Sequence, residues 1–330
     1  MLSTLAYKEY ELKFSDIRVS TMTTTAQTGV KIDIPKLYEA VPLLPYHVLR
    51  DGILKIQTGT STRGISCHNL LRHDKKGKDK KGKAFFNQAT LVVRREVSPL
   101  HWKEINVKVF KNGGIQMTGI RSSEMARDTL TWLLDHIQTT CKDVPLFEGT
   151  IRLHKFQVHL INSDFSIGAP IHRDILCNVL SKTYSLACMY ETTIYQGVKT
   201  KYFYNDTNTT HPGRCTCPTL CKGNGTGHGV NQCKKVTVSP FQTGEVIIQA
   251  SGLPDGSMLH IEEAMKFIQG VFRTHAKEVV RKQYILPEEE TRPSLSKASK
   301  AGKWIPHPTP RHIFTIAKSS LVEPASKSAS

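Results

Sequence analysis

The sequence lacks the features that mark a membrane protein, a secreted protein or an enzyme. It has no apolar run long enough to cross a bilayer and no signal peptide. It also lacks a phosphate-binding loop, a paired-carboxylate motif and a His-rich catalytic signature. We therefore expect a non-enzymatic protein of a reduced, intracellular compartment, in which the sequons at Asn205, Asn208 and Asn224 are not glycosylated.

Acidic residues are few, with 28 Asp and Glu against 45 Lys and Arg, so the net charge is +17. Such a balance indicates a polyanionic partner, and the alternative is a basic protein with solubilising tails. The densest basic run, residues 75–83, is typical of a solvated, flexible loop that can still contact phosphates.

The chain is organised around a strand–turn–strand–helix unit over residues 104–137. Apolar and polar residues alternate in 105–110 and in 115–118, as in half-buried strands, and Asn112-Gly113-Gly114 between them is typical of a tight turn. Ser122 can cap an amphipathic helix that covers one face of this hairpin. We interpret the other face as a binding surface. It carries Lys108, Phe110, Gln116 and Thr118.

The same unit recurs over residues 235–272, with Phe241-x-x-Gly244 standing where Phe110-x-x-Gly113 stood. Two copies are too few for a solenoid, so the repeat predicts one pseudo-twofold unit. In the second copy Phe241, Ile247 and Gln249 share the face turned away from the helix.

The run F-x-x-G-x-x-x-x-T-G-x-[KR]-S, here residues 110–122, resembles the repeat signature of the TATA-binding protein family. Residues 19–21 and 31–34 resemble the opening strand and first helix entry of that family, and the resemblance covers residues 15–282 with insertions. The basic insertions and a Cys-rich insert make the chain most similar to the divergent TATA-binding-like proteins of large nucleocytoplasmic DNA viruses.

The resemblance implies an α+β fold, namely a pseudo-twofold saddle made of a curved antiparallel sheet with helices on its convex face. We expect a leader at 1–14 and a first repeat at 15–145 with a basic insertion at about 42–83. A second repeat at 146–285 holds the Cys-rich insert, 205–235, and a disordered tail follows at 286–330.

The resemblance also implies a function: a transcription initiation factor that binds and bends promoter DNA through the minor groove. Its partners would be double-stranded DNA and a general transcription factor or a viral RNA polymerase, with no membrane. Its place would be a viral factory in the host cytoplasm or the host nucleus, with packaging in the virion left open. The alternative is a protein-interaction scaffold that kept the fold and lost specific DNA contact.

Each family repeat carries two phenylalanine wedges that pry base steps apart. Phe110 and Phe241 match one wedge in each repeat, while the other falls on Phe85 or Phe86 in the first and Tyr195 in the second. For all five aromatics the alternative is an ordinary core residue.

Further site residues follow from the same resemblance. The paired asparagines of the saddle centre fall on Ile17 and Val158, and the counterpart of Thr118 is Gln249, which puts TATA selectivity in doubt. Expected phosphate contacts, each with a plain surface charge as its alternative, are Arg94, Arg95, Lys108 and Lys199.

Four of the eight cysteines are clustered as Cys215-x-Cys217-x3-Cys221-x11-Cys233. Four thiolates within nineteen residues suit tetrahedral zinc, which would tie a Gly-rich loop, so we expect structural Zn²⁺. The Cys-x-Cys spacing is tighter than in the usual knuckle. His211 or His228 in place of one thiolate therefore stays open, and unligated thiols are the main alternative.

Overall fold

The computed structural model describes residues 7–8, 10–71 and 86–284. Phe85, the basic run 75–83 and the expected tail 286–330 lie outside the described residues. The chain divides into a main unit, Lys8–Gln283, and a second unit formed by Met1–Tyr7 and Tyr284–Ser330. Two short strands, β1 (Tyr7–Lys8) and β13 (Gln283–Tyr284), pair with each other, and everything below concerns the main unit.

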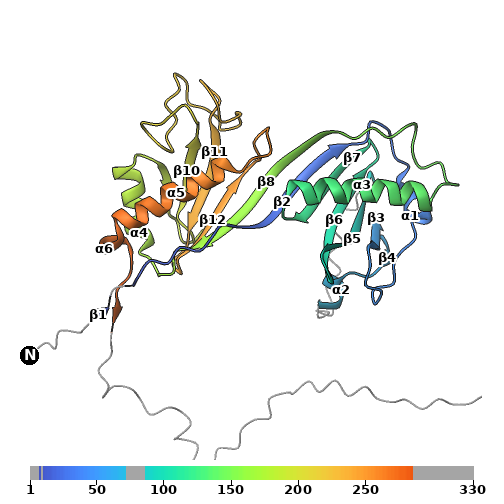
Figure 1. The fold of residues 1–330 in the computed structure, drawn as a ribbon, viewed down its shortest axis with the longest axis horizontal. Helices are drawn as coiled ribbons and strands as arrows, with labels where there is room; N and C mark the ends of the chain where they lie inside the picture. The colour runs from blue at the N-terminus through green and yellow to red at the C-terminus, as the bar shows by residue number, and fades with distance from the viewer. Residues whose placement is uncertain (1–6, 9, 72–85, 285–330) are drawn as a thin grey trace, which may run out of the picture. The chain divides into compact units, whose positions relative to one another are not determined.

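The main unit is built on one 11-stranded sheet with the order β4-β3-β5-β6-β7-β2-β8-β12-β11-β10-β9 (Figure 1). Neighbouring strands pair antiparallel throughout. The strands are β2 (Arg18–Gln27), β3 (Gly52–Thr58), β4 (Ser61–Gly64), β5 (Gln88–Ser98), β6 (His101–Phe110), β7 (Gly114–Ile120), β8 (His154–Ser166), β9 (Ala187–Met189), β10 (Lys199–Tyr204), β11 (Lys234–Pro240) and β12 (Glu245–Ala250).

The sheet consists of two halves that repeat one strand order. Apart from the edge strand β4, the order β3-β5-β6-β7-β2 towards the centre corresponds to β9-β10-β11-β12-β8, and β2 pairs with β8 at the junction. The predicted α+β class with a large antiparallel sheet is therefore confirmed. The repeat boundaries at 145 and 285 stay predictions.

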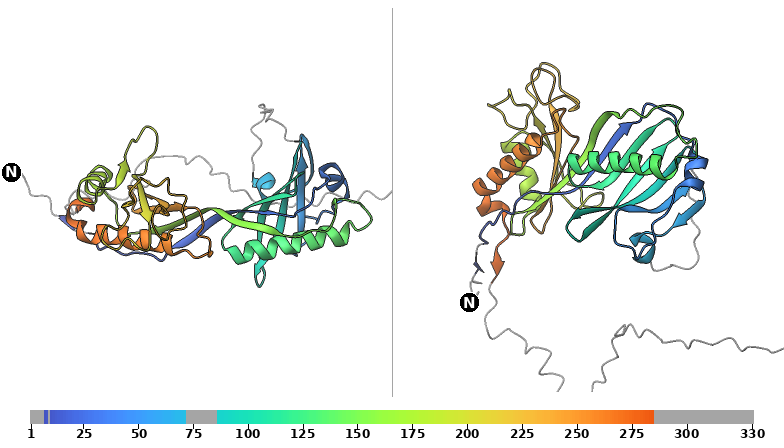
Figure 2. Two further views of the ribbon diagram at one scale, coloured as in Figure 1. Left: turned by 90° about the horizontal axis from the view of Figure 1, so that it is seen from above. Right: turned by 45° about the vertical axis from the view of Figure 1, so that its right-hand side comes forward.

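Two long helices lie on the same side of this sheet, α3 in green and α5 in orange in Figure 2. Strand β2 contributes to both cores from this side: Met22, Thr24 and Ala26 are buried in alternation, with Met22 in the core under α5 and Ala26 in the core under α3. The helices are α1 (Ile34–Ala40), α2 (Cys67–Leu71), α3 (Ser123–Thr140), α4 (Arg173–Asn178) with its π-helical continuation η1 (Val179–Thr183), α5 (Leu259–Thr274) and α6 (Ala276–Val279). In the part of the chain that the structure describes, none of these helices has the length and apolar character needed to span a bilayer.

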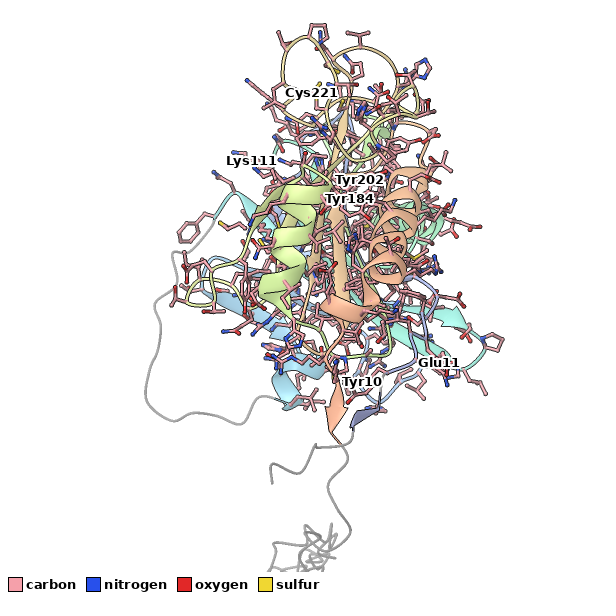
Figure 3. All side chains as sticks on the ribbon, turned by 90° about the vertical axis from the view of Figure 1, so that its left-hand side faces the viewer. Tyr10, Glu11, Lys111, Tyr184, Tyr202 and Cys221 are labelled. Carbon is pink, nitrogen blue, oxygen red and sulfur yellow. The ribbon has the colours of Figure 1, made fainter. Side chains whose placement is uncertain are left out.

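Each half has its own hydrophobic core. Helix α3 starts where Ser122 accepts a hydrogen bond from the backbone N–H of Met125 (3.1 Å), and it buries the predicted apolar stripe against the first half of the sheet. Under α5 the second core includes an aromatic cluster, in which Tyr184 and Tyr202 pack against Phe267 with ring centroids 5.4 and 5.3 Å away (Figure 3).

The two hairpin turns have the same geometry. Gly113 and Gly244 adopt φ values of 82° and 92°, a region that favours glycine. A Cβ at Gly113 would lie 2.1 Å from the carbonyl oxygen of Val30, and one at Gly244 would lie 2.2 Å from that of Ala169. Each turn is thus pressed against the backbone that follows the opening strand of its own half, so both positions require glycine.

Candidate nucleic-acid interface and metal centre

The side of the sheet opposite α3 and α5, here named the open face, carries most of the predicted binding residues. In β6 and β7 the apolar residues point into the first core, and their neighbours along the strand are at least partly exposed on the open face. The same alternation holds in β10 and β12 of the second half. The structure places on this face Lys108, Phe110, Gln116, Thr118, Lys199, Phe241, Ile247 and Gln249.

Two aromatic side chains of the second half form one contact pair. The rings of Tyr195 and Phe241 lie edge to face, with centroids 5.6 Å apart, and both are partly exposed. A Cβ at Gly197 would lie 2.9 Å from the Tyr195 ring and 3.2 Å from the Phe241 ring, so this glycine leaves room for the pair. The two residues that the resemblance assigns to wedges are therefore adjacent in the second half.

The first half has a less compact arrangement. Phe110 is partly exposed, and its partner in the strand register is Gln88. Phe86 is 73% exposed, and its ring lies over Gly59 at the β3–β4 turn, where a Cβ would come within 2.7 Å. Exposure of this degree separates Phe86 from an ordinary core residue, and Phe85 lies outside the described residues.

The prediction that Arg94 contacts phosphate is wrong. Its side chain is buried, and Nη1 donates hydrogen bonds to the carbonyl oxygens of Tyr46 and Val48, both at 2.8 Å. The guanidinium also lies 4.8 Å from the ring centroid of Tyr46 and 3.9 Å from the carboxylate of Glu104. The guanidinium of Arg94 thus interacts with groups inside the protein and does not face DNA.

Arg95 is also placed wrongly by the sequence, because it points to the opposite side of the sheet. It continues the row of Leu91 and Val93, which face the first core. Its guanidinium stacks over the ring of Trp132 in α3 at 4.6 Å and forms an ion pair with Asp51. Arg95 therefore fastens the end of β5 to α3.

A segment that we name the cap, residues 42–50, explains the burial of Arg94. It covers the open face over β3 and β5, where Leu44, Leu54 and Val92 form a small third core. Tyr46 and Val48 pack against that core. The sequence predicts an insertion here, but not that it covers part of the expected binding face.

The centre of the open face also differs from the prediction. Ile17 and Val158, which were expected to replace the saddle asparagines, are partly buried against the second core. The register of β2 with β8 shifts at three points, between Val19/Thr21, Thr23/Thr24 and Thr25/Gln27, and each shift can change the face to which later side chains point.

Polar pairs that the sequence did not reveal occupy this centre instead. Three hydrogen-bonded pairs link the central strands, and the strand registers place them on the open face. They are Arg18–Asp164 at 2.8 Å, Thr25–His159 at 2.7 Å and Gln249–Asn162 at 2.8 Å.

Positive charge on the open face gathers in the second half. Besides the predicted Lys199, which is exposed, Lys201 lies two residues further along β10 and is exposed as well. In the register of β10 with β11, Lys235 pairs with Phe203 and Thr237 pairs with Lys201. Lys201 and Lys235 therefore lie on neighbouring strands, two positions apart. Lys201 and Lys235 were missed, although strand alternation starting from Lys199 would have found Lys201.

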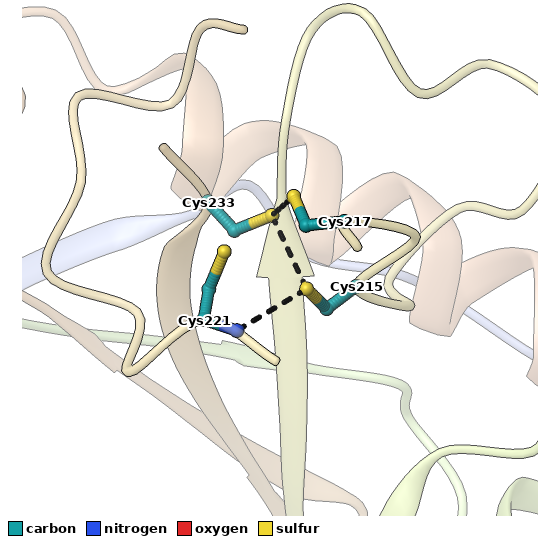
Figure 4. Close-up of side chains that lie close together, drawn as sticks. All are labelled: Cys215, Cys217, Cys221 and Cys233. Carbon is teal, nitrogen blue, oxygen red and sulfur yellow. Dashed lines mark hydrogen bonds between the residues drawn. The ribbon is translucent and has the colours of Figure 1, made fainter. Parts of the chain in front are cut away.

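The four clustered cysteines converge in the connection between β10 and β11 (Figure 4). All four sulfur atoms lie within 4.8 Å of one another, with 3.6 Å from Cys217 to Cys233 and 3.8 Å from Cys233 to Cys215. A tetrahedral zinc ion with Zn–S bonds of about 2.3 Å needs S–S separations of about 3.8 Å. The donor set therefore fits a metal ion of this kind.

The surroundings of the sulfur atoms differ in polarity. Burial opposes ionisation of Cys215, but hydrogen bonds from the backbone N–H groups of Cys221 and Cys217 bring its pKa down to about 7. Burial raises the pKa of Cys233 to about 12. A bound cation would favour the thiolate at every position, so these values describe the metal-free thiols.

The histidines that were open alternatives have partners of their own. His228 Nδ1 lies 2.9 and 2.8 Å from the two carboxylate oxygens of Asp206, and His211 Nδ1 lies 3.0 Å from the hydroxyl of Thr210. Among the described residues, the group suited to a metal ion consists of the four cysteines.

Comparisons with known proteins find similarity both in sequence and among solved structures. No family model matches the chain. A TATA-box-binding protein-like protein of Acanthamoeba polyphaga mimivirus is 26% identical in a match of 275 residues, and the match covers 80% of this chain and 67% of that protein. The TBP of Methanococcus jannaschii aligns with a TM-score of 0.41 and 13% identity, over 79% of this chain and 99% of that chain. A score of this size supports no statement about the fold, which rests on the strand order above.

The sequence relative matches most of this chain, including both halves of the sheet. Its name agrees with the family that the repeat motif at Phe110 and Phe241 resembles, and it comes from a virus. The predicted resemblance is thus confirmed: this chain is similar to the viral TATA-box-binding-protein-like proteins.

Proposed function

We propose that this protein is a non-enzymatic transcription initiation factor that binds duplex DNA across the open face and bends it through the minor groove. One observation carries the proposal: Phe110 and Phe241 stand at corresponding turns of the two sheet halves, and both reach the open face. The two halves would then form the pseudo-twofold saddle that the resemblance implies.

The aromatic side chains would act as wedges. Unstacking a base step costs a few kcal/mol, and an apolar side chain inserted at the step offsets that cost while the bent duplex gains contact area. In the second half the edge-to-face pair of Tyr195 and Phe241 offers two rings at one place. The hydroxyl of Tyr195 makes this end less apolar, so we expect Phe241 to be the inserted residue.

Lysines that are exposed or partly exposed on the open face would bind the DNA backbone. Lys108 in the first half and Lys199, Lys201 and Lys235 in the second lie on the same face as the wedges. Contacts of this kind release counterions and fix the orientation of the protein without reading the sequence. This part of the affinity should fall for any duplex as salt increases, whereas the part that comes from inserted wedges should remain at moderate salt.

A structural zinc ion would be held by Cys215, Cys217, Cys221 and Cys233. Bound there, it would supply cross-linking of the connection between β10 and β11, with no role in a reaction. Cys233 directly precedes Lys234, the first residue of β11, so the metal site would be anchored to the sheet.

The side of the sheet covered by α3 and α5 would face the transcription machinery. A duplex on the open face leaves these helices accessible, and the partner would be a general transcription factor or a viral RNA polymerase. We also propose that this activity takes place in a viral factory in the host cytoplasm or in the host nucleus, since the sequence relative comes from a virus.

A second candidate function is a protein-interaction scaffold that has lost specific DNA contact. The cap favours it, because the cap covers the open face over β3 and β5, and Arg94, an expected phosphate contact, is buried beneath it. The two candidates differ in what they predict for DNA.

A bending assay on the full chain decides between them. Duplexes selected from a random library and labelled at both ends report bending by energy transfer. Binding that survives moderate salt and shortens the end-to-end distance supports the initiation factor. Binding that disappears at moderate salt, or that leaves the duplex straight, favours the scaffold.

A further inference from the structure

We propose that Asn162 and Gln249 form an amide pair that reads the 2-amino group of guanine in the minor groove, so that the second half of the open face takes a G·C base pair. This inference rests on the proposed function, because it names the base pair that the same DNA-binding face selects.

The two side chains meet in a defined place on the sheet. Gln249 of β12 stands directly opposite Asn162 of β8 in the strand register, and its Nε2 donates a hydrogen bond to Asn162 Oδ1 at 2.8 Å. Their strand neighbours Ile248 and Ile161 are buried in the second core. Both amides therefore point to the open face, and both are partly exposed there.

The hydrogen bond between the two amides leaves one hydrogen-bond donor and one acceptor for a ligand. With Gln249 as donor, its own Oε1 stays available as an acceptor and Asn162 Nδ2 stays available as a donor. If both amides were turned over, Asn162 would donate to Gln249, and again one acceptor and one donor would remain. The pair thus offers an adjacent donor and acceptor whichever way the amides are assigned.

The floor of the minor groove distinguishes base pairs by one group. An A·T pair presents only acceptors there, whereas a G·C pair adds the guanine 2-amino donor between acceptors. A donor beside an acceptor matches G·C. At an A·T pair the acceptor of the amide pair would face another acceptor and lose its partner, which is costly once water is excluded.

The corresponding place in the first half is built differently. Thr118, the repeat counterpart of Gln249, stands opposite Thr23 in the register of β7 with β2. A threonine hydroxyl rotates to suit its partner and can donate to the acceptors of an A·T pair. The open face is therefore asymmetric, with hydroxyls in one half and an amide pair in the other, and we expect an asymmetric site on DNA.

Base analogues test this inference on the unaltered full-length protein. In a duplex selected from a random library, each G·C pair is replaced in turn by inosine·C, which lacks the 2-amino group. We expect one position at which this replacement weakens binding about five-fold or more. An A·T pair at that position should weaken binding as well. Placing 2,6-diaminopurine·T there instead, which adds the amino group, should restore the affinity.

Variants assign the effect to the amide pair. Asn162→Thr with Gln249→Thr copies the arrangement of the first half and should make binding insensitive to inosine at that position. Gln138→Thr, an exposed position on α3, is the matched control and should retain the sensitivity.

Two results overturn the inference, and they are distinguishable. If the duplex is bound and bent but inosine is neutral or favourable at every position, the guanine reading is wrong while the proposed function stands. If no duplex is bound or bent, the proposed function fails and the inference fails with it. The analogue series needs no variant, so a misfolded variant leaves the test intact.

Discussion

Phe110 and Phe241 occupy the same place in the two halves of one sheet, since each accepts through its carbonyl oxygen a hydrogen bond from the glycine three residues later, at 2.9 and 3.0 Å. The same turn geometry therefore places one aromatic ring on the open face in each half of the sheet. Insertion into a duplex at two places requires such a ring in both halves.

Truncating these rings should reduce DNA bending without unfolding the protein. We expect Phe110→Ala and Phe241→Ala each to lower the bend and the affinity, because an apolar wedge is lost, while the melting temperature changes little. Energy transfer on end-labelled duplexes and a thermal melt measure the two effects. Phe272→Ala is the control: this side chain is fully buried, and its truncation should cost about 3–5 kcal/mol of folding stability. A large loss of stability with an unaltered bend for Phe110→Ala would end the wedge hypothesis.

The cysteine cluster should bind about one equivalent of zinc, as a single four-ligand site requires. Cys217→Ser should release the metal and make the segment 205–235 sensitive to protease, with the sheet still folded. Cys67→Ser serves as the control, since it removes a thiol outside the cluster. Metal analysis together with limited proteolysis decides the matter, and a metal-free preparation with a protease-resistant segment would contradict the prediction.

Arg94 should contribute to folding stability, and Lys108 should contribute to DNA binding. Arg94→Met leaves the carbonyl oxygens of Tyr46 and Val48 without their donor, so we expect the free energy of unfolding to fall by about 1–3 kcal/mol. The slope of log affinity against log salt should not change. Lys108→Gln should do the reverse, with an unchanged stability and a slope shallower by about 0.9 if it contacts one phosphate. Denaturant titration and binding at several salt concentrations test both variants, and a shallower slope for Arg94→Met would restore it as a phosphate contact.

Stability should fall in mild acid because of His260. The imidazole is buried, Nε2 hydrogen-bonds the carbonyl oxygen of Ser251 at 2.9 Å, and burial lowers its pKa to about 4. The unfolded chain binds this proton near pH 6.5, so stability is present above that pH and is lost as the pH falls from about 6.5 towards 4, by up to about 3 kcal/mol. His260→Gln retains a donor for Ser251 and should flatten the pH dependence over this window. Equal slopes for the two proteins in denaturant titrations would refute the assignment.

Strand alternation and motif spacing predicted the parts of the site that depend on local sequence. They placed Phe110, Gln116 and Phe241 on the face away from the helices, and the close spacing of the cysteines anticipated their clustering. Both properties depend mainly on residues close together in the sequence, which is why the sequence could predict them.

The predictions are wrong where contacts with distant segments determine the position of a side chain. Nothing near Arg94 reveals that residues 42–50 fold back over it, and nothing in 17–25 reveals the shifts in register or the packing of Ile17 against the second core. The position of Tyr195 depends on a distant segment in the same way. A turn that precedes β10 places its ring beside Phe241.

Strand β2 belongs by sequence to the first repeat, yet its Met22 is buried in the core of the second, while Ala26 is buried in the first. A fragment cut between the repeats would therefore expose an apolar surface on both products. We expect neither repeat to persist as an independent domain. The two halves repeat one strand order, but because they share this strand we expect them to unfold together in a single cooperative step.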